Sequence, residues 1–140
     1  IATDEPVMED IHGLRGQLMR YNQQQIGEHK LQNLGVFARD EHNRFLAGVY
    51  GWLQFGWLYI DLMWVDESLR KNGVGTHLMQ ELESLATDKG VSRAYLTTAS
   101  FQGMEFYQKL GYEICDQMNM VSDDGQEFIR YTMRKEQLNA

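Results

Sequence analysis

Apolar residues recur along this chain at two different periods, and the changes of period divide the chain into segments. Apolar side chains return every three or four positions, the spacing of a helix, in residues 6–26, 74–89 and 101–110. Runs with the composition and alternation of strands cover residues 34–39, 44–54, 57–65, 91–98, 112–121 and 127–134. Residues 40–43 (Asp-Glu-His-Asn) and 122–126 (Ser-Asp-Asp-Gly-Gln) have turn compositions, which predict two hairpins.

The order of these segments predicts the fold class. It reads helix, three antiparallel strands, helix, strand, helix, two strands, and the strand-helix-strand crossover at its centre requires one parallel strand pair. The run 57–65 is apolar on both faces except for Asp61, which predicts a central strand buried on both sides. We therefore expect an α/β (α+β) fold with a mixed, mostly antiparallel sheet, built as one domain over residues 1–140.

Composition and charge exclude several classes of protein. The net charge of −7 argues against nucleic-acid binding, and no apolar run reaches the roughly 18 residues of a membrane-spanning helix. The sequence starts with no basic and apolar signal segment, and Cys115 has no second cysteine to pair with, which is typical of a cytoplasmic protein. The four histidines lack metal-ligand spacing, so we expect no metal.

A glycine-containing turn follows the apolar run 57–65. Residues 65–76 read Val-Asp-Glu-Ser-Leu-Arg-Lys-Asn-Gly-Val-Gly-Thr, and a helical segment begins at their end. Backbone amides at such a helix N-terminus hold an anionic phosphate without a metal. The alternative is a tight strand-to-helix connection that needs flexible residues and binds nothing.

Two common phosphate-binding motifs do not match this turn. A Walker loop has Gly-Lys-Ser/Thr at the helix start, whereas Lys71 precedes the glycines here. A dinucleotide fingerprint needs a third glycine, where this chain has Leu78, and an acidic residue about 20 positions on, where it has residues 93–96 (Arg-Ala-Tyr-Leu). The turn therefore belongs to neither class.

Two segments resemble the GCN5-related N-acetyltransferases. Arg70-x-x-Gly73-x-Gly75 after a strand is similar to the family's acetyl-coenzyme A loop, Q/R-x-x-G-x-G/A. Residues 106–112 (Phe-Tyr-Gln-Lys-Leu-Gly-Tyr) are similar to its F-Y-x-x-x-G-F/Y segment, which follows the next strand. The resemblance covers residues 34–134, and it implies a parallel strand pair that splays at the cofactor site, between flanking helices.

The resemblance also implies roles for individual residues. The loop amides would bind the pyrophosphate of acetyl-coenzyme A, the backbone of the preceding strand would bind the pantetheine arm, and Tyr107 would protonate the leaving thiolate. Ser100 stands where the family often has an asparagine that bonds the cofactor arm. The expected cofactor-binding residues are Met63, Trp64, Val65, Arg70, Lys71, Asn72, Gly73, Val74, Gly75, Thr76, Ser100 and Tyr107.

Asp61 is the second catalytic candidate. A lone carboxylate on an apolar strand is costly to bury, so it is either hydrogen-bonded structurally or exposed in the cleft as a base or an ammonium anchor. Tyr107 has a structural alternative too, as an amphipathic core residue. Trp52, Trp57 and Trp64 are expected to fill the core, or else to wall the acceptor pocket or a dimer face.

The function predicted from these residues is transfer of acetyl from acetyl-coenzyme A to a primary amine of a small molecule or peptide. No residue is a convincing nucleophile, which favours direct attack in a ternary complex. We expect the first helix, residues 25–34 and the last hairpin to form the acceptor pocket. The acidic residues Glu5, Glu9, Asp10 and Glu28 either attract a cationic amine or are ordinary solvated charges. The alternatives are a non-catalytic acyl-coenzyme A sensor and an interaction domain. A homodimer is expected by analogy with the family.

Overall fold

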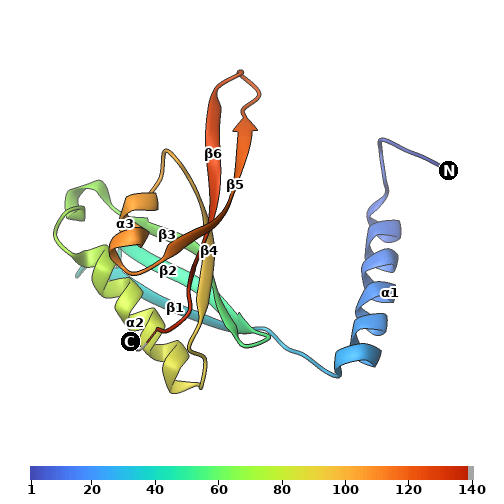
Figure 1. The fold of residues 1–140 in the computed structure, drawn as a ribbon, viewed down its shortest axis with the longest axis horizontal. Helices are drawn as coiled ribbons and strands as arrows, with labels where there is room; N and C mark the ends of the chain where they lie inside the picture. The colour runs from blue at the N-terminus through green and yellow to red at the C-terminus, as the bar shows by residue number, and fades with distance from the viewer. Residues whose placement is uncertain (139–140) are drawn as a thin grey trace. The chain divides into compact units, whose positions relative to one another are not determined.

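A computed structural model describes residues 1–138 of the chain, and contacts divide it into two compact units (Figure 1). The first unit, residues 1–30, holds α1 (Met8–Ile26), which begins after Pro6 and ends at Gly27 in a positive-φ conformation. The predicted helix is confirmed. None of its residues is buried in the structure, although Leu14, Leu18 and Tyr21 form an apolar stripe. No helix within residues 1–138 is long and apolar enough to cross a membrane.

The second unit, from Leu31 onward, is built on one six-stranded sheet with the strand order β1-β2-β3-β4-β6-β5. Only β3 and β4 are parallel, and the other neighbours are antiparallel. This confirms the predicted mixed, mostly antiparallel sheet with one parallel pair. The strands are β1 (Gln32–Arg39), β2 (Phe45–Gln54), β3 (Trp57–Val65), β4 (Ala94–Ala99), β5 (Glu113–Val121) and β6 (Glu127–Lys135).

Two α-helices and a short 3-10 helix connect the strands. The 3-10 helix η1 (Glu67–Leu69) and then α2 (Val74–Asp88) link β3 to β4, and α3 (Met104–Lys109) links β4 to β5. The helix α2 lies on β1, β2 and β3 because its apolar stripe, with Leu78, Leu82 and Ala86 fully buried, faces the sheet. The core is therefore the layer between α2 and one face of the sheet.

β3 does not have the two buried faces that its sequence predicts. Leu58 and Ile60 are buried, but Leu62 is 62% exposed and Trp64 is 47% exposed. The register with β2 explains the difference: Tyr50 pairs with Leu62 while Gly51 pairs with Ile60, so the residue between them is an extra one in a β-bulge. After the bulge the two faces exchange, and Leu62 and Trp64 point away from α2.

The bulge depends on a glycine in the opposite strand. A Cβ atom on Gly51 would collide with the backbone carbonyl oxygen of Tyr59, so the two strands approach too closely here for any side chain. The prediction that the tryptophans fill the core is wrong for the same region. Trp52 and Trp57 are half-buried and Trp64 is exposed on the face away from α2, because no helix of this unit covers that face.

The pairing of β3 with β4 ends at the bulge. Parallel pairs run from Leu58 with Ala94 to Ile60 with Leu96, whereas β3 continues to Val65 and β4 to Ala99. Beyond Ile60 the two strands have separated, and the sheet contains a fork. The fork opens at the carboxyl ends of two parallel strands, where α/β sheets bind ligands.

Candidate active site

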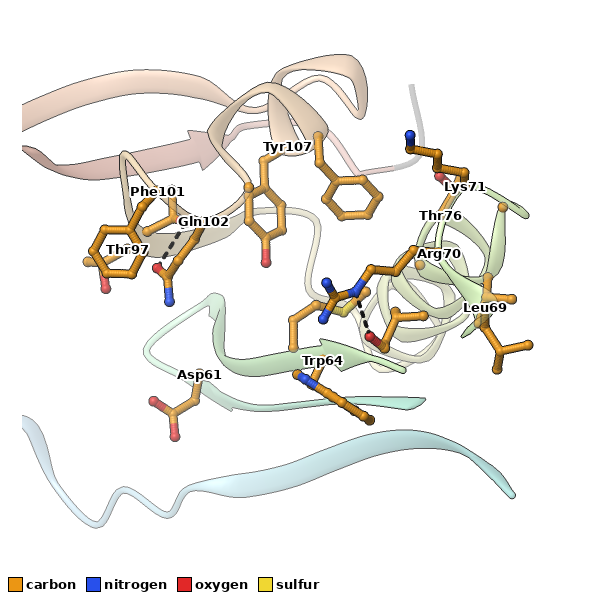
Figure 2. A pocket seen from close by; sticks show the side chains of 18 residues that line it. Asp61, Trp64, Leu69, Arg70, Lys71, Thr76, Thr97, Phe101, Gln102 and Tyr107 are labelled. Carbon is orange, nitrogen blue, oxygen red and sulfur yellow. Dashed lines mark hydrogen bonds between the residues drawn. The ribbon is translucent and has the colours of Figure 1, made fainter. Parts of the chain in front are cut away.

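A cavity of about 650 Å³ lies in the fork between β3 and β4 (Figure 2). Its walls are the second half of β3, the turn into α2, the end of β4 and the start of α3. Eleven of the thirteen residues that the sequence predicts for the site line this cavity: Asp61, Met63, Trp64, Val65, Arg70, Lys71, Gly73, Val74, Gly75, Thr76 and Tyr107.

The turn at one end of the cavity is arranged for an anion. Lys71 and Gly73 have φ angles of 69° and 79°, and Gly73 forms the N-cap of α2 in the left-handed conformation. The first amides of α2 have no partner inside the helix, since the first intrahelical bond runs from the amide of His77 to the carbonyl of Gly73. No acidic residue occupies the first turn of α2, so no side-chain negative charge there weakens the attraction of the helix dipole and the free amides for an anion.

Arg70 is held in place beside this turn. Its Nε donates a hydrogen bond to the carbonyl oxygen of Val65, at 3.0 Å, which leaves the rest of the guanidinium free toward the cavity (Figure 2). Asp66 caps η1 and accepts a hydrogen bond from the amide of Ser68, at 3.1 Å. Hydrogen bonds from Ser68 lower the pKa of Asp66, so the cap is ionised at neutral pH and fixes the exit from β3.

The two sequence motifs meet in space at Gly75. A Cβ placed on Gly75 would lie 3.2 Å from Cζ of Phe106 and 3.3 Å from Cε of Met63. The small residue in the loop therefore allows the second motif and β3 to pack directly on the start of α2. Spacing in the sequence does not reveal this contact.

Tyr107 enters the cavity from α3. Its side chain is only 9% exposed and its hydroxyl points into the cavity, between the loop end and the far end (Figure 2). The ring packs edge-on against Phe106 and Tyr112, with centroids at 5.1 Å and 6.1 Å. Burial raises the pKa of Tyr107 to about 12. The hydroxyl is therefore a protonated donor at neutral pH, and it has no hydrogen-bond partner among the described residues.

Asp61 is the extra residue of the β3 bulge. It has no paired residue in β2, where Tyr50 pairs with Leu62 and Gly51 with Ile60, and it is exposed at the point where the fork begins. A charge on this strand is therefore tolerated because it lies at the bulge and not in the core. Asp61 lines the cavity, but its carboxylate points away from the Tyr107 hydroxyl (Figure 2).

Two expected residues, Asn72 and Ser100, lie outside the cavity lining. Ser100 is tied to β6 instead: its amide donates to the carbonyl of Ile129 at 2.7 Å, and its Oγ accepts from the amide of Ile129 at 3.1 Å. A hydroxyl at position 100 is short enough to bond its own neighbouring strand, so it does not reach into the fork.

The structure also brings in residues that sequence reasoning missed. Thr97, Thr98, Phe101 and Gln102 line the cavity from the end of β4 and the turn that follows it. Gln102 stands out because its Oε1 accepts a hydrogen bond from the amide of Ala99, at 2.7 Å. The only sequence signal was a long polar side chain in the strand-to-helix turn shortly before Tyr107. Among residues 1–138, no group of three or more His, Cys, Asp or Glu side chains is placed to hold a metal ion.

Comparisons with known proteins agree with this geometry. The model of the Acetyltransferase (GNAT) family matches residues 7–112. Acetyltransferase Atu2258 of Agrobacterium fabrum is 28% identical over 80% of this chain and 82% of its own length. The blasticidin-S acetyltransferase of Streptomyces morookaense is 33% identical, over 60% of this chain and 62% of its own length.

Solved structures share the fold. The crystal structure of an acetyltransferase from Bacillus cereus is 27% identical and superposes with a TM-score of 0.82, over 96% of each chain. Two further neighbours of this fold, each under 25% identical, were solved with coenzyme A or acetyl-coenzyme A. The family match covers most of the chain and includes both motifs that line the fork, and the chain therefore belongs to the acetyltransferase (GNAT) family.

Proposed function

We propose that this acetyltransferase moves the acetyl group of acetyl-coenzyme A to the primary amine of a small molecule, by direct attack in a ternary complex. We propose further that residues 1–140 act as one domain and that the protein works in the cytoplasm. The observation that carries the proposal is the Tyr107 hydroxyl, a buried and protonated donor that points into a fork with an anion-binding turn at its other end.

The walls of the fork suit the parts of the donor. The free amides at the start of α2 and the side chains of Arg70 and Lys71 would hold the phosphates. Beyond Ile60 the edge of β3 that faces β4 has lost its strand partner, so its backbone groups are available for the amides of the pantetheine arm. A donor bound in this way would have its thioester near Tyr107.

Direct transfer forms one N–C bond and breaks one C–S bond. The ammonium of the acceptor first loses one proton, because an amine with a pKa near 10 is only about 0.1% free base at pH 7. The nitrogen lone pair forms the N–C bond, the C–S bond breaks, and sulfur leaves with the electron pair. Tyr107 donates its proton to the sulfur and regains one from the nitrogen. The products are the amide and coenzyme A with a free thiol.

Asp61 has a supporting role in this proposal. It lies where the fork begins as an exposed carboxylate, where it would attract the acceptor's ammonium group or receive its first proton through water. A small-molecule acceptor is favoured over a peptide because one relative is named for its action on blasticidin S.

A panel of amines, followed by release of free coenzyme A, tests the proposal. Turnover with at least one small primary amine is the expected result. Binding of acetyl-coenzyme A, seen as thermal stabilisation, without turnover on any amine would favour a sensor instead. Absence of both would favour an interaction domain that has kept the fold alone.

We also propose that the protein forms a homodimer through the face of its sheet that α2 does not cover. Phe37, Phe45 and Trp64 form a continuous exposed aromatic row there, with centroid separations of 6.2 Å and 6.1 Å, beside the exposed Leu62. Exposed apolar clusters of this kind mark interaction sites. Light scattering after gel filtration should give twice the 16.3 kDa of the chain. A Phe37→Ser variant should shift the mass toward the monomer, and a monomeric wild type would refute the dimer.

A further inference from the structure

We infer that the side-chain amide of Gln102 donates a hydrogen bond to the thioester carbonyl oxygen of the bound acetyl donor. This inference rests on the proposed function and adds a catalytic residue to it. No motif points to Gln102. The inference comes from how its side chain is fixed and from where its free end lies.

The amide of Gln102 has only one possible orientation. The backbone amide of Ala99 lies 2.7 Å from one terminal atom of the side chain, and a backbone amide only donates, so that atom is the oxygen. The hydroxyl of Thr98, itself buried, lies 3.3 Å from the same oxygen and donates a second bond. The oxygen is therefore held at the end of β4, and the NH₂ group is the end left free.

The free NH₂ group of Gln102 projects into the cavity (Figure 2). It has no hydrogen-bond partner among residues 1–138. An unpartnered donor whose other half is anchored by two bonds is a preorganised group, because it does not need to turn when an acceptor arrives.

Its place along the cavity indicates which part of the donor it meets. Arg70, Lys71 and Thr76 lie at one end of the cavity, Gln102 and Thr97 lie at the other, and Tyr107 lies between them (Figure 2). A coenzyme with its phosphates at the first end extends its thiol toward Tyr107. The group that continues past the sulfur is the acetyl carbonyl, so Gln102 is placed beside the atom that becomes an oxyanion.

Other polar side chains at this end suit the task less well. Asp61 only accepts when ionised, and it would repel the oxyanion. The Thr97 hydroxyl rotates about its C–O bond and has no described partner to fix it. The amide of Gln102 is the side-chain donor at this end whose direction is set before the reaction starts.

Gln102→Glu tests the inference because it changes only the free end of the group. A carboxylate oxygen still accepts from the amide of Ala99, so the turn stays anchored, but the donor becomes a negatively charged acceptor. We expect kcat to fall by about 10²–10³, as for removal of one oxyanion donor. Affinity for free coenzyme A and the unfolding temperature should stay close to wild type. Glu105→Gln, the reverse exchange on the exposed side of α3, serves as the matched control and should keep wild-type kcat.

Infrared spectroscopy of bound acetyl-coenzyme A, labelled with ¹³C at the carbonyl, gives a readout that needs no amine. The wild type should lower the carbonyl stretch relative to Gln102→Glu, because a hydrogen bond weakens the C=O bond. Equal stretches in the two proteins would overturn the inference, and so would a kcat within threefold of wild type. A loss of coenzyme A affinity at unchanged kcat would also overturn it, by assigning Gln102 to the cofactor arm. If the wild type acetylates no amine, only the proposed function is refuted, because the infrared shift tests the hydrogen bond from Gln102 without an amine.

Discussion

Replacing Tyr107 by phenylalanine removes one hydroxyl and leaves the packing of the ring in place. The ring is buried against Phe106 and Tyr112, and the hydroxyl makes no hydrogen bond to a described residue. The free energy of unfolding should therefore change by less than about 0.5 kcal/mol. Removal of a general acid costs about 10²–10⁴ in rate, so we expect kcat to fall at least about 100-fold, which is about 2.7 kcal/mol in the barrier.

Tyr112→Phe provides the matched control, because it removes the same atom a few residues away. The Tyr112 hydroxyl donates to Oε2 of Glu83 at 2.9 Å, and both side chains are buried. Loss of a buried hydrogen bond to a carboxylate costs about 1.5–3 kcal/mol. Tyr112→Phe should therefore lose stability and keep kcat, the opposite of Tyr107→Phe.

The assay follows coenzyme A thiol release at saturating amine and acetyl-coenzyme A, and urea unfolding of each variant measures stability. A Tyr107→Phe enzyme that keeps kcat within threefold of wild type would refute the assignment of Tyr107 as acid. Equal losses of stability in the two variants would show that the Tyr107 hydroxyl has a structural partner. Affinity for coenzyme A, measured in parallel, separates a defect in chemistry from a defect in binding.

Three further predictions address the remaining parts of the site and the core. First, kcat/KM should keep rising with pH up to about pH 10 as the amine loses its proton, with no descending limb, because the Tyr107 phenol remains protonated below its pKa of about 12. A descending limb between pH 8 and 10 that Tyr107→Phe abolishes would contradict this. Second, Gly73→Ala should lower the free energy of unfolding by about 1–2 kcal/mol, because Gly73 is the N-cap of α2 in a left-handed conformation that alanine disfavours, and Gly73→Asn should lower it less. Equal urea midpoints for the two variants and the wild type would argue against this backbone conformation. Third, Lys135→Met should lower the free energy of unfolding by about 3 kcal/mol, because Nζ lies 2.9 Å from Oε1 of the buried Glu83 and its removal leaves that carboxylate without a counter-charge. Adding Glu83→Gln should recover part of the loss, and a double variant less stable than Lys135→Met would refute this explanation.

Most of the fold was predictable because each segment carries its own periodicity and its own boundary residues. The helix α2 is an example: its apolar stripe of Leu78, Leu82 and Ala86 and the turn before it predict both the helix and the face that it buries. The parallel pair was predictable for a different reason. A strand-helix-strand crossover leaves few alternatives for the direction of the second strand.

The loop side of the site was predictable from local sequence, and the far side was not. Arg70 to Thr76 form a continuous segment whose residue types suit its geometry. Gln102 and Ser100 differ by two positions, and only the hydrogen bonds show that the first faces the fork while the second is tied to β6. Such a choice depends on which neighbouring strand each side chain reaches, and no period in the sequence records it.

The faces of β3 were assigned wrongly because alternation was assumed to continue through the strand. A single extra residue, Asp61, exchanges the faces, and the requirement for it lies in the opposite strand at Gly51, where the backbones approach each other closely. The same bulge coincides with the end of β3–β4 pairing, after Ile60 and Leu96. One local irregularity therefore places a carboxylate where the fork begins, turns Met63 and Val65 toward α2, and ends the strand pairing where the donor is expected to bind. In this account the lone charge on an apolar strand, the exposed Trp64 and the opening of the fork have a common origin in the bulge.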